Sequence, residues 1–143
     1  MKTAAVLWPL LIFGACQQPA VGPDTQQVSG ETVVLAPGQE VRVGGLLHVW
    51  FGEVLSDSRC PTDVVCVWAG NAEVQIGLAL GTGPTHPFRL NTTLQPASAD
   101  FGGYRVTLVA LTPAPVSTRL IDPAEYRAHL KVETIPDPSS DPT

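Results

Sequence analysis

Alternation of apolar and polar residues is the feature that most constrains the fold of this chain. Over residues 126–133 (YRAHLKVE), Tyr, Ala, Leu and Val alternate with Arg, His, Lys and Glu. Residues 73–80 (EVQIGLAL) and 104–110 (YRVTLVA) repeat the pattern, which places Leu108 and Ala110 on one face. Because successive side chains of a strand point to opposite faces, a period of two predicts strands with one buried face.

Shorter segments of the same character bring the predicted set to about seven strands, each bounded by turns rich in Gly and Pro. They are residues 32–36, 40–43, 46–54 and 87–91. Many short strands with such turns predict an all-β fold, a single antiparallel β-sandwich or a small barrel. Residues 122–125 (DPAE) differ, because a capping Asp, a Pro in the first turn and a Glu three positions later predict a short helical turn.

The N-terminus has the pattern of an export signal. Lys2 precedes an apolar stretch, residues 4–15 (AAVLWPLLIFGA). This stretch is too short for a bilayer span, which needs about 20 apolar residues, and it fits the apolar region of a signal peptide. We therefore expect residues 1–15 to be removed on export.

The sequence Phe13-Gly14-Ala15-Cys16 resembles the cleavage site of bacterial lipoprotein precursors. Two small residues precede the cysteine, although Phe13 stands where an aliphatic residue is usual. The resemblance implies that Cys16 is lipidated and holds the protein at a membrane through its N-terminal lipid. Gln rather than Asp follows Cys16, so we expect the outer membrane, facing the periplasm or the cell surface.

The rest of the chain divides by composition into three parts. Residues 16–29 are polar with Pro, Gly and Gln, which predicts a flexible tether. Residues 30–135 contain all the predicted strands and form one β-sandwich domain. Residues 136–143 (PDPSSDPT) have no large apolar side chain, which predicts a disordered tail.

Charge excludes some partners. The chain has 8 Lys and Arg against 13 Asp and Glu, a formal net charge of −5. Nucleic acids and anionic lipids bind clustered cations, and no such cluster occurs. The three histidines, His48, His86 and His129, lie far apart in the sequence, so we expect no metal site and no cofactor.

Cys60 and Cys66 lie in the predicted folded part of an exported protein, where two cysteines are expected to pair. The bridge would close a loop of about seven residues and stabilise the fold by about 2.4 kcal/mol. A redox dithiol, which usually has two intervening residues, and a metal site are the competing interpretations.

The cysteines belong to a longer motif. Residues 57–61 (DSRCP) are followed by Cys66 and by residues 68–70 (WAG). This motif resembles one in small uncharacterised bacterial exported proteins and lipoproteins, whose pattern also includes the segments 33–43 and 103–132. The resemblance supports paired cysteines and a β fold, and it implies no substrate.

Two interpretations of the residues around the cysteines are open. In a structural interpretation, Asp57 and Ser58 accept backbone N–H bonds, and Trp68 covers the disulfide or plugs one end of the fold. In a functional one, the loop is a recognition surface in which Arg59 offers a carboxylate fork. Trp68 or Trp50 would then be an apolar anchor.

Motifs of catalysis are missing from the sequence. We find no Gly-x-Ser-x-Gly turn, no His-Glu-x-x-His helix and no phosphate-binding Gly-rich loop. We therefore expect a lipid-anchored, non-catalytic envelope protein that binds a protein or a glycan. The alternatives are a small envelope enzyme with an unrecognised site and a structural surface lipoprotein without a specific ligand.

Overall fold

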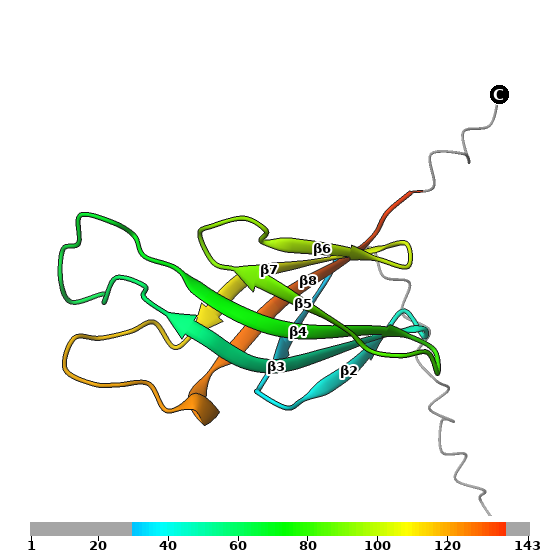
Figure 1. Ribbon diagram of the computed structural model, residues 1–143, viewed down its shortest axis with the longest axis horizontal. Coiled ribbons are helices and arrows are strands. Elements are labelled where there is room, and N and C mark those ends of the chain that lie inside the picture. Colours follow the sequence, from blue (N-terminus) through cyan, green and yellow to red (C-terminus); the bar gives the residue numbers. More distant parts are fainter. Residues whose placement is uncertain (1–29, 137–143) are drawn as a thin grey trace, which may run out of the picture.

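Two antiparallel four-stranded sheets face each other in the computed structural model, which describes residues 30–136 (Figure 1). One sheet has the strand order β1-β8-β7-β6 and the other β2-β3-β4-β5. The strands are β1 (Glu31–Leu35), β2 (Glu40–Val43), β3 (Leu47–Asp57), β4 (Ala72–Leu80), β5 (His86–Asn91), β6 (Ser98–Phe101), β7 (Tyr104–Thr112) and β8 (Arg127–Thr134). Within residues 30–136 no strand of one sheet pairs with a strand of the other, so the fold is a β-sandwich and not a barrel.

The predicted alternation builds the core between the sheets. In β8, the side chains of Ala128, Leu130 and Val132 are completely buried, while the residues between them are not. Phe51 of β3 and Ile76 of β4 are completely buried on the facing sheet. Each fully buried side chain of the size of Leu or Phe contributes about 1.5–3 kcal/mol, so these two inner faces hold the sheets together.

The sequence predicted about seven strands, and residues 30–136 contain eight. The additional strand, β6 (SADF), has four residues, of which only Ala99 is buried. It is held by its pairing with β7 rather than by an apolar face of its own. Unlike the equally short EVRV of β2, SADF contains no β-branched residue, so the sequence gives no strand signal there.

The predicted face of β7 is wrong at one position. Its pairing with β8 shifts register between Leu108 and Ala110, as at a β-bulge. Such an extra residue reverses the direction of the side chains that follow. Leu108 and Leu111 are therefore buried, and Ala110 is exposed.

The predicted helical turn is confirmed as a 3-10 turn, η1 (Pro123–Glu125). The Asp122 side chain accepts a hydrogen bond from the N–H of Ala124 at 2.9 Å. The Glu125 carboxylate accepts one from the N–H of Asp122 at 3.0 Å. The capping pattern read from the sequence is therefore present.

The sandwich has two different ends. β3 ends at Asp57 and leads into residues 58–71, the disulfide loop, so we call this end the disulfide end (left in Figure 1). β1 begins and β8 ends at the opposite end, where the N–H of Ile135 donates to the carbonyl of Gly103 at 2.8 Å. The predicted signal peptide, the tether with Cys16 and residues 137–143 of the predicted tail lie outside the described residues.

Candidate functional site

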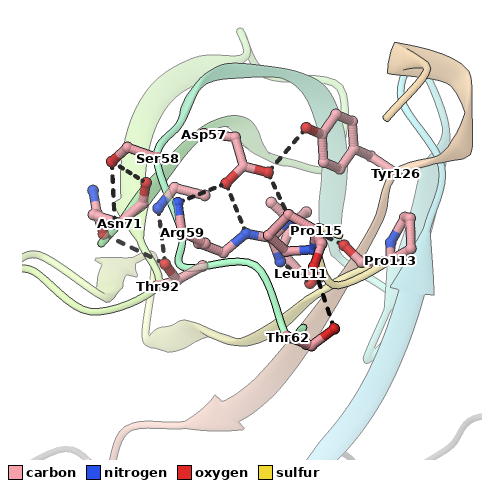
Figure 2. A network of polar contacts seen from close by, with 11 residues as sticks. Asp57, Ser58, Arg59, Thr62, Asn71, Thr92, Leu111, Pro113, Pro115 and Tyr126 are labelled. Atoms are coloured by element: carbon pink, nitrogen blue, oxygen red, sulfur yellow. Dashed lines mark hydrogen bonds and ion pairs between the residues drawn. The ribbon is translucent and has the colours of Figure 1, made fainter. Parts of the chain in front are cut away.

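The disulfide loop is the candidate site. Cys60 and Cys66 form a disulfide with a Cα–Cα distance of 5.9 Å, which confirms the predicted pairing. Two residues at the end of β3 and the start of the loop, Asp57 and Arg59, hold the loop on the sandwich, as Figure 2 shows.

Asp57 and Arg59 form a two-point ion pair. The Nε of Arg59 donates to Oδ1 of Asp57 at 2.8 Å, and its Nη2 donates to Oδ2 at 2.6 Å. Both side chains are largely buried, with 12% of Asp57 and 13% of Arg59 exposed. The backbone N–H of Arg59 also donates to Asp57 at 3.2 Å, as the structural interpretation of this carboxylate expected.

This ion pair connects the two sheets (Figure 2). Arg59 donates from Nη1 to the carbonyl of Leu111 and from Nη2 to the carbonyl of Pro113 at 3.0 Å. The phenol of Tyr126 donates to Oδ2 of Asp57 at 3.0 Å. Leu111 lies at the end of β7, and Tyr126 directly precedes β8, so one polar cluster joins β3 to both central strands of the other sheet.

Burial and hydrogen bonding act in opposite directions on the Asp57 carboxyl. Burial raises its pKa, but the hydrogen bonds from Arg59 and Tyr126 outweigh this and hold the pKa below the ordinary value of 3.8. Burial, followed by the hydrogen bond to Asp57, raises the pKa of Tyr126 above 10.0. At neutral pH the carboxylate is therefore charged and the phenol protonated, which is the state that forms the cluster. The guanidinium of Arg59 is occupied inside the protein, so its role here is structural.

The two ends of the disulfide loop are in close contact and close its base. The N–H of Ser58 donates to the carbonyl of Asn71 at 2.7 Å, and its hydroxyl donates to the same oxygen at 3.0 Å. Gly70 has a φ of 70°, and a Cβ there would lie 1.9 Å from the carbonyl oxygen of Ser58. Only glycine fits this approach, so the two ends of the loop meet at Gly70.

One flank of the loop is fixed to the segment between β7 and η1. The N–H of Thr62 donates to the carbonyl of Pro115 at 2.9 Å. The carboxylate of Asp63 accepts hydrogen bonds from the N–H and the hydroxyl of Ser117, at 2.8 and 2.5 Å. The bonds from Ser117 also lower the pKa of the exposed Asp63 carboxyl. The loop is therefore held at its base and along this flank.

Beyond these contacts the loop ends in exposed apolar side chains. We call Val64, Val65, Val67 and Trp68 the apolar tip. Val65 is fully exposed, Val67 is 91% exposed and Trp68 is 82% exposed. Trp68 thus plugs no end of the sandwich and presents most of its surface to solvent. The recognition interpretation requires this exposure, and the sequence could not decide it.

Two hollows flank the disulfide loop. The larger, about 540 Å³, lies between the loop and the segment before η1, and Asp57, Arg59 and Tyr126 contribute to its wall. The smaller, about 360 Å³, lies between Trp68 and Leu94. We call the smaller one the Trp68–Leu94 groove.

Sequence reasoning missed two exposed leucines at this end, Leu94 and Leu120. Each is an isolated large apolar residue in a connecting segment, Leu94 between β5 and β6 and Leu120 between β7 and η1. A leucine outside every alternating segment is the signal that could have identified them.

Trp50 does not belong to this site. It lies in the middle of β3, paired with Gly77 of β4, and it is half-buried on the outer face of the sheet. Its ring covers two glycines, since a Cβ at Gly52 or Gly77 would lie 2.9 Å from an indole carbon. Of the predicted recognition residues, the structure thus brings Asp57 and Arg59 together. It places Trp68 in the same loop but beside a different hollow, and it places Trp50 elsewhere.

No group of three or more His, Cys, Asp or Glu side chains within residues 30–136 is arranged to hold a metal ion. None of these described residues forms a helix long and apolar enough to cross a bilayer. Comparison of the chain with protein-family models, with curated proteins and with solved structures gave no match.

Proposed function

We propose that this protein is a lipid-anchored, non-catalytic binding module of the bacterial cell envelope, and that the disulfide loop is its contact surface. One observation carries the proposal. The loop exposes three valines and a tryptophan at its apolar tip while its base and flank are fixed by a disulfide, an ion pair and backbone hydrogen bonds.

Exposing apolar side chains to water, as the apolar tip does, is energetically unfavourable. Soluble monomers rarely expose contiguous apolar patches above a few hundred Å², and larger patches mark interaction sites. Tryptophan is enriched among the residues that dominate binding energies. Because the loop is already braced, little conformational entropy is lost when a partner orders it. Exposed apolar groups on a rigid loop thus favour binding over a purely structural role.

The position of the loop supports the same function. β1 begins at the end of the sandwich opposite the disulfide loop. A lipid on Cys16, joined through residues 16–29, would attach the domain to the membrane at this opposite end. The apolar tip would then be the end farther from the point of attachment, which leaves it accessible to an envelope protein or glycan.

A site-specific crosslink in intact cells tests the contact surface. Val67 is replaced by the photoreactive residue p-benzoylphenylalanine, and the matched control carries it at Leu46, an exposed residue of the opposite end. We expect a discrete crosslinked product after irradiation from position 67 and none from position 46. Equal products from both positions, or none from either, would argue against a binding role for the loop.

The anchor is tested separately. With Cys16→Ser, the protein should leave the membrane fraction and appear in the soluble envelope fraction, because the acyl chains that hold it are lost. Unchanged fractionation would refute the lipid anchor without affecting the crosslinking result.

A further inference from the structure

We infer that the partner of the disulfide loop is a peptide segment of another protein, with a large apolar side chain seated in the Trp68–Leu94 groove. This inference rests on the proposed function and specifies it. Three observations favour this occupant: the construction of the groove, the free backbone beside it and the absence of charge around it.

The Trp68–Leu94 groove is preformed. The exposed surface of its lining is almost entirely apolar, and the residues that form it are Ser58, Trp68, Ala69, Gly70, Asn71, Thr93 and Leu94. Its volume of about 360 Å³ lies at the small end of the range for ligand pockets, about 300–1,000 Å³. Such a groove suits one apolar side chain rather than a large ligand.

Hydrogen bonds fix the two walls of this groove to each other. The hydroxyl of Thr93 donates to the carbonyl of Gly70 at 2.6 Å. The side-chain oxygen of Asn71 accepts from the N–H of Thr93 at 3.1 Å and from that of Leu94 at 3.3 Å. Because these hydrogen bonds already fix the two walls in place, an incoming side chain would not have to open the groove.

The backbone next to the groove has free hydrogen-bonding groups. The N–H and carbonyl groups of Val65, Cys66, Val67 and Trp68 form no hydrogen bond with any of residues 30–136. Inserted into hydrocarbon, these groups would lose their water without a replacement, at a cost of several kcal/mol for each group. A peptide backbone offers both donors and acceptors, so a peptide suits this surface better than a bilayer does.

The charges around the groove favour an uncharged partner. The residues that line the groove have no ionisable side chain. Arg59, next in sequence to the groove residue Ser58, is paired with Asp57 at 2.6 Å, and Arg89 of β5 is paired with Glu73 of β4 at 3.1 Å. Phosphate groups and acidic peptides therefore find no cation among the residues that line the groove, which favours an apolar segment of a protein.

Residues 137–143 of the same chain are a poor candidate for the occupant. Residues 137–143 follow β8, which ends at the opposite end of the sandwich. Seven residues reach at most about 25 Å, whereas the eleven residues of β3 alone extend about 36 Å. The segment also contains no large apolar side chain to fill the groove.

Selection from a phage-displayed library of random linear peptides tests the inference on the full chain. We expect enriched peptides that share a large apolar residue, and synthetic copies of them should bind with an affinity measurable by fluorescence anisotropy. Leu94→Ser and Trp68→Ser should each weaken this binding about tenfold or more, as expected for residues central to a contact. Both side chains are largely exposed, so the variants should fold, which circular dichroism checks.

Leu46→Ser is the matched control. Leu46 and Leu94 are the same residue type and both are 59% exposed, but Leu46 lies at the opposite end of the sandwich. Peptide affinity should not change in this variant. No enrichment, or equal affinities for the Leu94→Ser and Leu46→Ser variants, would overturn the inference.

Two other occupants have their own readouts. The first is a membrane. It would be indicated if the phage library enriched no peptide and if Leu94→Ser bound phosphatidylcholine vesicles more weakly than the unchanged chain. Self-association lost in Leu94→Ser would assign it to a second copy of this chain. Either result would overturn the peptide inference. A crosslink from position 67 combined with failed peptide selection would leave the proposed function intact.

Discussion

The phenol of Tyr126 and the carboxylate of Asp57, 69 positions apart in the sequence, share a hydrogen bond of 3.0 Å at the disulfide end of the sandwich. Tyr126 directly precedes β8 of one sheet, and Asp57 ends β3 of the other. Because Asp57 also holds Arg59, this bond connects the brace of the disulfide loop to the second sheet. Stability of the fold and rigidity of the candidate site thus depend on the same carboxylate.

Removing the phenol should therefore destabilise the protein. Tyr126→Phe keeps the ring and deletes one hydrogen bond to a charged acceptor, for which a loss of about 1.5–3 kcal/mol in the free energy of unfolding is usual. Urea denaturation measures the change. Tyr104→Phe is the control, because the Tyr104 hydroxyl forms no hydrogen bond within residues 30–136, and it should cost much less. Equal losses would show that the Tyr126–Asp57 bond contributes little.

Asp57 should also link stability to pH. Its pKa is lower in the folded protein than in an unfolded chain, where it is about 3.9, so folding favours the ionised form. This contribution is fully present above about pH 4 and is lost as the pH falls through the folded pKa.

The measurement compares the free energy of unfolding of the unchanged protein and of Asp57→Asn as the pH is lowered from neutral. The variant should be less stable at neutral pH, and its stability should fall less steeply below about pH 4. Asp63, Asp100 and Glu125 also have lowered pKa values, but they remain in both proteins and their effect should largely cancel. Parallel profiles would exclude Asp57 as a proton-linked group.

Features encoded within a few residues could be predicted from the sequence. The alternation that gives β8, the capping pattern of η1 and the pairing of Cys60 with Cys66 all depend on neighbours close in the chain. β6 could not be predicted, because its four residues are defined by pairing with β7.

The sequence predicted where the candidate site lies in the chain, but not what each of its residues does. The motif identified the loop with Asp57, Arg59 and Trp68, but the contacts of Arg59 with Leu111 and Pro113 cross more than fifty positions. Whether Trp68 is buried depends on which way the loop turns, and no local pattern encodes this direction. For the same reason, the sequence alone could not show that Leu94 faces Trp68 across a groove.

The disulfide should stabilise the fold by restricting the unfolded chain. Replacing both cysteines, Cys60→Ser with Cys66→Ser, should lower the free energy of unfolding by about 2.4 kcal/mol, the chain-entropy value for a loop of about seven residues. Urea denaturation under non-reducing conditions measures the loss. Reduction of the unchanged protein should give a similar loss, and an unchanged midpoint would show that the bridge is energetically neutral.

Gly70 should be the least replaceable residue of the disulfide loop. In Gly70→Ala the new methyl group would lie 1.9 Å from the carbonyl oxygen of Ser58, so the base of the loop must move apart. Overpacking of this kind typically costs about 1–3 kcal/mol, and the positive φ of 70° adds about 1–2 kcal/mol of backbone strain.

Gly38→Ala is the control, because Gly38 has a φ of 80° but no atom within 4 Å of the place that a methyl group would take, which leaves only the strain. Urea denaturation should rank Gly70→Ala as clearly less stable than Gly38→Ala, and faster hydrogen exchange at the N–H of Ser58 should accompany this loss. Equal stability of the two variants would mean that the ends of the loop are not in close contact.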